Sequence, residues 1–159
     1  MVLISGPSGC GKSTIIQRLL SCPEVEFSVS ATTRPIREGE VDGADYHFLS
    51  QDEFRSRVES GAFIEWAEVY GNLYGTLRAP METAIQGGRV FLVEIDVQGA
   101  LQLRALGEEG VFVFIAPPSF EELQNRLVGR GTEAALMYMA AADSVSKVQV
   151  RFNSILIPF

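Results

Sequence analysis

Short apolar runs alternate with helix-like stretches along this chain. The apolar runs predict buried strands at Val2 to Ile4, Val25 to Val29, Phe63 to Tyr70, Arg89 to Ile95, Val111 to Ala116 and Val148 to Ile157. The stretches between them predict helices over Ser13 to Leu20 and Leu101 to Leu106. Strands that alternate with helices in this way predict an α/β fold with a parallel sheet.

Polar residues mark two further helix starts and one long loop. Ser50 with Glu53, and Ser119 with Glu122, fit the capping box, in which a hydroxyl and a carboxylate satisfy free N–H groups at a helix start. Residues 31–46 are rich in Gly, Arg and Asp, which predicts a long loop with short strands.

Length and composition indicate one globular domain, residues 1–159. With 47% apolar and 21% charged residues, the 159-residue chain has enough apolar side chains to bury a core. No apolar run approaches the roughly 18 residues of a membrane span, and the first residues lack a basic segment, so we expect a cytoplasmic protein without a membrane partner. The two cysteines are too few for a disulfide framework, which favours a reducing compartment.

The charge balance limits the kind of ligand. Thirteen basic and twenty acidic residues leave a net charge of −7, and this acidic field disfavours nucleic-acid partners. A small anionic ligand stays compatible with it, because a local arginine cluster acts over a few ångströms.

A phosphate-binding motif follows the first predicted strand. Gly6-Pro-Ser-Gly-Cys-Gly-Lys12-Ser13 satisfies G-x-x-x-x-G-K-[ST] between a strand and a helix, which favours a P-loop over a simple glycine-rich turn. Its backbone N–H groups would face a phosphate, Lys12 would add positive charge, and the Ser13 hydroxyl would ligate Mg²⁺. We interpret Cys10, at a variable position, as a small filler.

An acid ends the strand that begins at Phe91. Asp96 stands where P-loop proteins place a carboxylate beside the Mg²⁺, although strand-end acids are also often merely solvated. Residues 96–99 also match D-x-x-G of GTPases, but no N-K-x-D motif follows, which disfavours a GTPase.

Further motifs follow the P-loop in a fixed order. They are Ser30-Ala-Thr-Thr-Arg34-Pro-Ile-Arg37 with Asp45-Tyr46-His-Phe, Phe63-Ile-Glu65-Trp, Gly71-Asn-Leu-Tyr74-Gly-Thr76, Glu94-Ile-Asp96-Val-Gln-Gly and Arg126-Leu-Val-Gly-Arg130-Gly-Thr132. From about residue 2 to residue 133 the chain resembles guanylate kinase. The resemblance implies a P-loop nucleoside monophosphate kinase fold, with a five-stranded parallel core, helices on both faces, an inserted GMP-binding region and a lid.

The resemblance also implies an organisation and a reaction. Residues 1–30 and 79–125 would form the core, 31–78 the GMP-binding region, 126–142 the lid and 143–159 a divergent tail. The substrates would be ATP and GMP, with Mg²⁺ as cofactor and in-line transfer to GMP without a covalent enzyme intermediate.

The implied site residues form four sets. ATP would be bound by Gly6, Pro7, Ser8, Gly9, Cys10, Gly11, Lys12, Ser13 and Thr14. GMP would be bound by Ser30, Arg34, Arg37, Tyr46, Glu65, Tyr74, Thr76, Arg78 and Glu94. The catalytic set would be Lys12, Arg34, Asp96, Arg126 and Arg130, and Mg²⁺ would be held by Ser13 and Asp96, directly or through water.

The chemistry of these side chains fits the two halves of GMP. Arginine forks and tyrosine hydroxyls suit a phosphate, although a solvated basic loop has a similar composition. Guanine presents N1–H and N2 amino donors, which carboxylates such as Glu65 and Glu94 can accept, while the Ser30 and Thr76 hydroxyls can serve its other polar atoms.

Three arginines and one histidine carry alternative interpretations. Arg78, Arg126 and Arg130 would approach the transferring phosphoryl group, where guanidinium charge is effective, and the last two also suit a helix C-terminus. His47 is expected to be a strand residue, since a phosphate monoester needs no general base.

Two other functions are compatible with parts of the pattern. One is a non-catalytic guanylate-kinase-like interaction module, which the intact Lys12 and Ser13 disfavour. The other is a different P-loop kinase, which the guanine-type acids disfavour.

The pattern changes after Thr132. The resemblance would call for another lid arginine, a strand with an Asn-Asp pair and a final helix, whereas residues 134–143 carry no arginine and Asn153 is followed by Ser. We therefore expect this chain to bind ATP and GMP but to turn them over slowly, with modest thermal stability.

Overall fold

Two sheets organise the chain in the computed structural model, which describes residues 1–7, 9–117, 119, 121–123, 125 and 155–158. The larger sheet contains the five strands β2 (Val25–Phe27), β7 (Val90–Glu94), β1 (Val2–Ser5), β8 (Val111–Ala116) and β9 (Ile155–Pro158), in that order. All of its pairings are parallel, which confirms the five-stranded parallel core.

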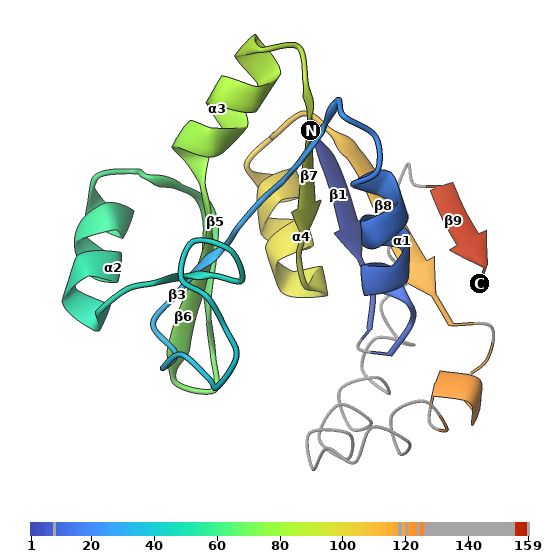
Figure 1. Ribbon diagram of the computed structural model, residues 1–159, viewed down its shortest axis with the longest axis horizontal. Coiled ribbons are helices and arrows are strands. Elements are labelled where there is room, and N and C mark those ends of the chain that lie inside the picture. The colour runs from blue at the N-terminus through green and yellow to red at the C-terminus, as the bar shows by residue number, and fades with distance from the viewer. Residues whose placement is uncertain (8, 118, 120, 124, 126–154, 159) are drawn as a thin grey trace.

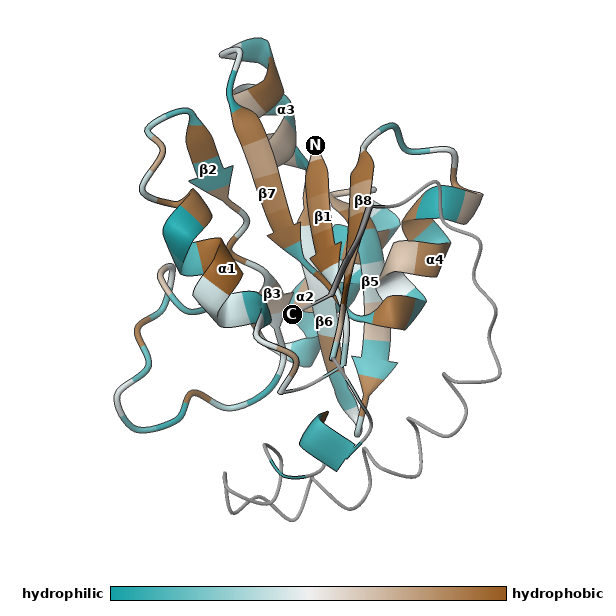
Figure 2. Cartoon of the chain, turned by 90° about the vertical axis from the view of Figure 1, so that its right-hand side faces the viewer, coloured by the Kyte–Doolittle hydropathy of each residue, from teal (hydrophilic) through white to brown (hydrophobic). Residues whose placement is uncertain are grey.

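Helices cover both faces of this sheet. Helix α1 (Lys12–Leu19) packs on one face, and α3 (Arg78–Gln86) and α4 (Val97–Ala105) pack on the other. The adjacent residues Leu3 and Ile4 of β1 are both buried, one in each of the two resulting clusters. Because both faces are covered, the central strands are continuous apolar runs, seen as the brown ribbons of β1, β7 and β8 in Figure 2.

The smaller sheet is formed from the segment between β2 and α3. Its order is β4 (His47–Phe48), β3 (Ala31–Thr32), β6 (Asn72–Leu77) and β5 (Phe63–Val69), and α2 (Gln51–Glu59) packs against it. Phe54 of α2 is fully buried, and its ring stacks on that of Phe63 with centroids 4.4 Å apart. This second apolar cluster makes the smaller sheet a packed unit of its own, as Figure 1 shows beside the larger sheet.

Helix α4 connects the two sheets. It contacts β5 of the smaller sheet as well as β1 of the larger one, and Ile64 of β5 belongs to the same buried cluster as Leu103. A Cβ on Gly99 would lie 2.6 Å from Ile95 and 3.1 Å from a carboxylate oxygen of Glu65, so only glycine permits this approach.

The predicted helix starts are confirmed. Ser50 caps α2 by accepting a hydrogen bond from the Glu53 backbone N–H at 3.1 Å, and Ser119 accepts one from the Glu122 N–H at 3.1 Å. The Glu53 carboxylate pairs with Arg57, one turn further on, at 2.7 Å. The observed bonds at the start of α2 are therefore the hydroxyl half of the capping box and an i,i+4 ion pair.

Strand β6 and helix α3 are additions to the elements predicted from the sequence. Tyr70 and Gly71 both have positive φ, at 51° and 78°, which closes a tight hairpin from β5 into β6 where only a strand end was expected. Helix α3 has Leu77 as its N-cap, without a side-chain cap bond, and Pro80 in its first turn, so it carries no polar start signal.

The remaining predictions concern the end of the chain and membrane spans. Strand β9 lies within the predicted 148–157 range apart from Pro158, while residues 126–154, including Arg126, Arg130 and the predicted lid, lie outside the described residues. Within the described part of the chain, no helix is long and apolar enough to cross a membrane.

Phe54→Ala should destabilise the smaller sheet strongly. Removing a fully buried ring that stacks on Phe63 leaves a cavity, so we expect a loss of about 3–5 kcal/mol in the free energy of unfolding, measured by urea denaturation. Phe54→Leu, which fills part of the space, should lose less. A loss below about 1 kcal/mol for Phe54→Ala would show that α2 is not anchored by this ring.

Candidate active site

The P-loop is built between β1 and α1. Gly6 follows β1 with φ +148°, and a Cβ there would collide with the carbonyl oxygen of Ile115 on β8. Gly11 precedes α1 with φ +96° and accepts hydrogen bonds from the Thr14 and Ile15 N–H groups. The packing of Gly6 against β8 and the positive φ of Gly11 at the start of α1 thus both require glycine. Ser8 lies outside the described residues.

Lys12 folds back over this loop. Its Nζ donates to the carbonyl oxygens of Gly6, at 2.9 Å, and Pro7, at 3.1 Å, and lies 3.8 Å from a carboxylate oxygen of Glu94. Ser13 and Thr14 are exposed in the first turn of α1. The ammonium group therefore lies inside the loop, with an acid on its far side.

Cys10 points into the core. Its side chain is fully buried in the cluster that contains Ile16 and Ile115, and burial raises the pKa of its thiol despite the nearby Lys12. This placement agrees with its interpretation as a small filler.

Two acids leave the end of β7 in different directions. Glu94 is opposite Ile4 in the β1–β7 pairing, which places it beside the P-loop and Lys12. Asp96 is the N-cap of α4, where it accepts a hydrogen bond from the Gly99 N–H at 2.8 Å. The Asp96 carboxylate therefore faces the start of α4, and its charge acts on Glu65 of β5.

Glu65 is a buried carboxylate between the sheets. It is 9% exposed, and its Oε1 accepts a hydrogen bond from the Thr76 hydroxyl at 2.6 Å. Burial raises its pKa, the Thr76 bond opposes that shift, and the charge of Asp96 adds to it. A carboxylate whose ionised form is destabilised by burial and by a neighbouring acid is typical of a binding site.

The loop after β3 gathers the phosphate-type side chains. The Arg34 guanidinium lies 5.4 Å from the centroid of the Tyr46 ring and 5.6 Å from that of Phe48, and the Tyr46 and Tyr74 rings meet edge to face at 6.1 Å. Burial raises the pKa of Tyr46, and Glu94 is among the charges that act on it. The arginine–tyrosine cluster thus lies near enough to Glu94 for the charge of that carboxylate to act on Tyr46.

Three further residues that were expected to bind GMP differ from this cluster in their exposure and contacts. The side chain of Arg37 is exposed, and Ser30 is half-buried with its carbonyl oxygen bonded to the His47 N–H at 2.9 Å, which confirms His47 as a strand residue. Arg78 lies 3.5 Å from Glu108 and donates to the Phe63 carbonyl oxygen at 3.5 Å. The structure therefore does not bring Arg78 to the arginine–tyrosine cluster.

Glu40 is a site residue that was not expected from the sequence. Its carboxylate oxygens lie 2.7 and 3.0 Å from the two terminal nitrogens of Arg34. In the sequence, Glu40 is only an acid six positions after an arginine in the same loop. This spacing predicts no contact, because the fold of the loop decides which side chains meet.

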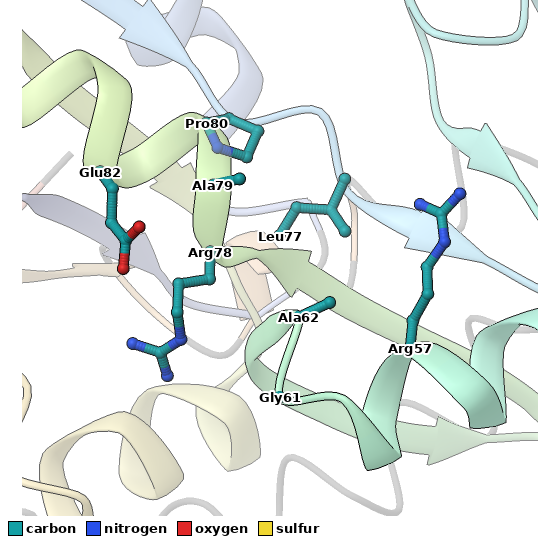
Figure 3. Close-up of a pocket in the computed structure, with 8 residues that line it drawn as sticks. All are labelled: Arg57, Gly61, Ala62, Leu77, Arg78, Ala79, Pro80 and Glu82. Carbon is teal, nitrogen blue, oxygen red and sulfur yellow. The ribbon is translucent and has the colours of Figure 1, made fainter.

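A cavity of about 380 Å³ lies where the smaller sheet joins α3. Its lining combines small and apolar residues with three charged side chains, Arg57, Arg78 and Glu82, and Figure 3 shows the two arginines extending in opposite directions. Both guanidinium groups are ion-paired, with Glu53 and Glu108 respectively. This cavity lies apart from the P-loop and from Arg34.

Comparisons with known proteins agree with this geometry. The family model described as guanylate kinase matches residues 1–157, beyond residue 133 where the motif resemblance ends. The chain is 46% identical over 147 residues to the guanylate kinase of Clostridium tetani, covering 92% of this chain and 71% of that protein. It is 49% identical over 134 residues to that of Clostridioides difficile, covering 84% of this chain and 65% of that protein.

A solved structure shows the same fold. The crystal structure of guanylate kinase from Anaplasma phagocytophilum superposes with a TM-score of 0.74 at 34% identity, over 99% of this chain and 75% of that one. The family match over nearly the whole chain, the relatives' identity and the shared fold agree, and the chain belongs to the guanylate kinase family.

Proposed function

We propose that this chain transfers the terminal phosphoryl group of ATP to GMP, giving ADP and GDP. The observation that carries the proposal is the arrangement of three groups around the ends of β1 and β7. The P-loop with Lys12 meets the acid Glu94 there, and the buried Glu65 of the smaller sheet lies against the first turn of α4, which follows β7. Guanylate kinases are enzymes of this reaction, and the family match supports it.

GMP supplies its own nucleophile. A phosphate monoester has a second pKa near ~6, so it is mostly a dianion at neutral pH and needs positioning rather than a general base. Arg34, Arg37, Tyr46 and Tyr74 are the proposed phosphate ligands, and the cluster of Arg34 with the two tyrosine rings supports this.

The two strand-end acids are best assigned by their neighbours. Asp96 acts electrostatically on Glu65, which supports this pair as the acceptors for the guanine N1–H and N2 donors. Glu94 lies 3.8 Å from Lys12, which supports a place beside the ATP phosphates. This assignment exchanges the roles that the sequence suggested for Glu94 and Asp96.

The residues beside the P-loop fit a magnesium ion carried by ATP. Mg²⁺ prefers oxygen ligands and uses one or two protein carboxylates together with substrate phosphates. The exposed Ser13 hydroxyl and the Glu94 carboxylate are such oxygens. Bound Mg²⁺ would neutralise charge on the transferring phosphoryl group, and Lys12 would add to that effect.

The other parts of the assignment rest on the resemblance. Residues 31–78 would bind GMP, residues 1–30 and 79–125 would form the core, and Arg126 and Arg130 of the 126–142 segment would contact the transferring phosphoryl group. A cytoplasmic location fits the two free cysteines, Cys10 and Cys22, because a reducing compartment keeps thiols unpaired.

ADP production should depend on GMP. We expect a coupled assay to show ADP release with GMP, slow as expected from the changed pattern after Thr132, and only background release with AMP or water. Lys12→Ala should lower kcat by about 100-fold or more with a smaller change in GMP affinity, since Lys12 acts where charge changes during transfer. Equal ADP release with all three acceptors would refute the function, and a chain that binds GMP without turnover would be an interaction module.

The acid assignment predicts a split in kinetics. Asp96→Asn keeps a good N-cap for α4 but removes a carboxylate, so it should raise KM for GMP about tenfold and leave KM for MgATP nearly unchanged. Glu94→Gln should lower kcat and kcat/KM for MgATP, with KM for GMP changing less than about twofold. The reverse pattern would restore the assignment made from the sequence.

Glu65→Gln should weaken GMP binding without lowering stability at pH 7. Burial raises the pKa of Glu65 above its unfolded value. The contribution of Glu65 to the free energy of unfolding is therefore fully present only at low pH, where the carboxyl is protonated, and it is lost as pH rises through the folded pKa. The neutral amide avoids that loss and still accepts from Thr76. Melting curves from pH 4 to 8 should therefore favour the variant increasingly as pH rises, whereas a difference independent of pH would contradict this.

A further inference from the structure

Glu40 binds both arginines of the loop after β3. Its Oε1 accepts from Nη2 of Arg34 at 2.7 Å, and its Oε2 accepts from Nη1 of Arg34 at 3.0 Å and from the Arg37 backbone N–H at 2.8 Å. The Glu40 N–H donates to the Arg37 carbonyl oxygen at 3.1 Å, which closes the turn that carries Arg37. One carboxylate thus fixes the guanidinium of Arg34 and the backbone of Arg37 together.

The geometry of the Arg34 guanidinium leaves a second edge for a ligand. Of its five N–H donors, two bind Glu40 and one on Nη1 binds the Pro35 carbonyl oxygen at 2.8 Å. The two other donors, on Nε and Nη2, are parallel and form a second fork of the kind that binds a phosphate through two oxygens. Glu40 therefore uses the end of the guanidinium and does not block its side.

The aromatic side chains restrict the orientation of the Arg34 guanidinium and therefore of its Nε–Nη2 edge. Arg34 lies over the rings of Tyr46 and Phe48, which restrict the plane of the guanidinium. The Arg34 pKa is raised first by the hydrogen bond to Glu40 and in smaller part by Tyr74, whose ring meets that of Tyr46 edge to face at 6.1 Å. Tyr46 and Tyr74 are the hydroxyls proposed above to share the phosphate with Arg34.

We propose that Glu40 is a positioning residue for the acceptor phosphate: it holds the end of the Arg34 guanidinium and the Arg37 turn, so that the other edge of Arg34 faces the substrate. The inference rests on the proposed function, because it assigns this cluster to the GMP phosphate. Glu40 is not a stand-in for that phosphate, since its carboxylate is also bonded to the Arg37 backbone and binds only the Nη1–Nη2 end of the Arg34 guanidinium.

Glu40→Gln tests this role with little change in size. The amide turns one acceptor into a donor that faces Arg34, so KM for GMP should rise about 10- to 100-fold, while KM for MgATP and kcat change by less than about threefold. Glu40→Asp, which keeps the charge, should recover part of the GMP affinity. Asp45→Asn is the matched control, because Asp45 is an acid of the same loop whose carboxylate accepts the Val41 N–H, at 2.8 Å. The KM of this variant for GMP should stay within about twofold of the parent.

A double-mutant cycle separates positioning from a general effect on the loop. If Glu40 acts through Arg34, Glu40→Gln should add less than about twofold to KM for GMP in an Arg34→Ala background. The full effect in that background would overturn the proposal, as would a lower KM for GMP in Glu40→Gln, which would mean that Glu40 competes with the phosphate.

Binding measurements separate this proposal from the proposed reaction. Calorimetric titration with GMP and with guanosine should show the Glu40→Gln loss for GMP alone, because guanosine lacks the phosphate. A parent chain that binds GMP in this way without GMP-dependent ADP release would refute the reaction and leave the role of Glu40 supported. A parent chain that does not bind GMP, or an equal loss with guanosine, would overturn the role of Glu40.

Discussion

The parallel pairing of β1 with β7 determines the rest of the candidate site. Parallel strands end at the same edge of a sheet, and here Ile4 lies opposite Glu94, so the P-loop and the end of β7 emerge side by side. Lys12 reaches back to this edge and lies 3.8 Å from Glu94. The neighbouring β8 supports the same arrangement, because Gly6 passes close to the Ile115 carbonyl oxygen.

Helix α4 links the end of β7 to the smaller sheet. It starts at Asp96, directly after β7, and its Gly99 allows the Glu65 carboxylate to pack against the helix. The ionised form of Glu65 is destabilised by burial and by the charge of Asp96, and one hydrogen bond from Thr76 offsets part of that cost. Ionisable groups that are buried away from water in this way are characteristic of binding sites, where a ligand supplies the hydrogen-bond partners that water would provide.

The arginine cluster shows how an acidic protein can hold directed cationic donors in one loop. The chain has a net charge of −7, yet Arg34 is held by a carboxylate, two aromatic rings and a backbone carbonyl within one loop. At contact distances such directed donors matter more than the overall field, which is screened over about 10 Å at 0.1 M salt. Glu40 lowers the charge of the cluster and gives Arg34 a defined orientation.

Local signals in the sequence determined the P-loop, most of the strands, the capped helices and the family resemblance, because each depends on residues close together in the chain. The same signals missed β6 and α3, whose hairpin turn and uncapped start are recognised only in three dimensions. Side-chain direction was decided by the tertiary structure alone: the β1–β7 register turns Glu94 toward Lys12, and the start of α4 binds Asp96 as its N-cap at Gly99, beside Glu65. The physical reason is that a carboxylate's role depends on which charges and donors surround it, and those come from segments distant in sequence.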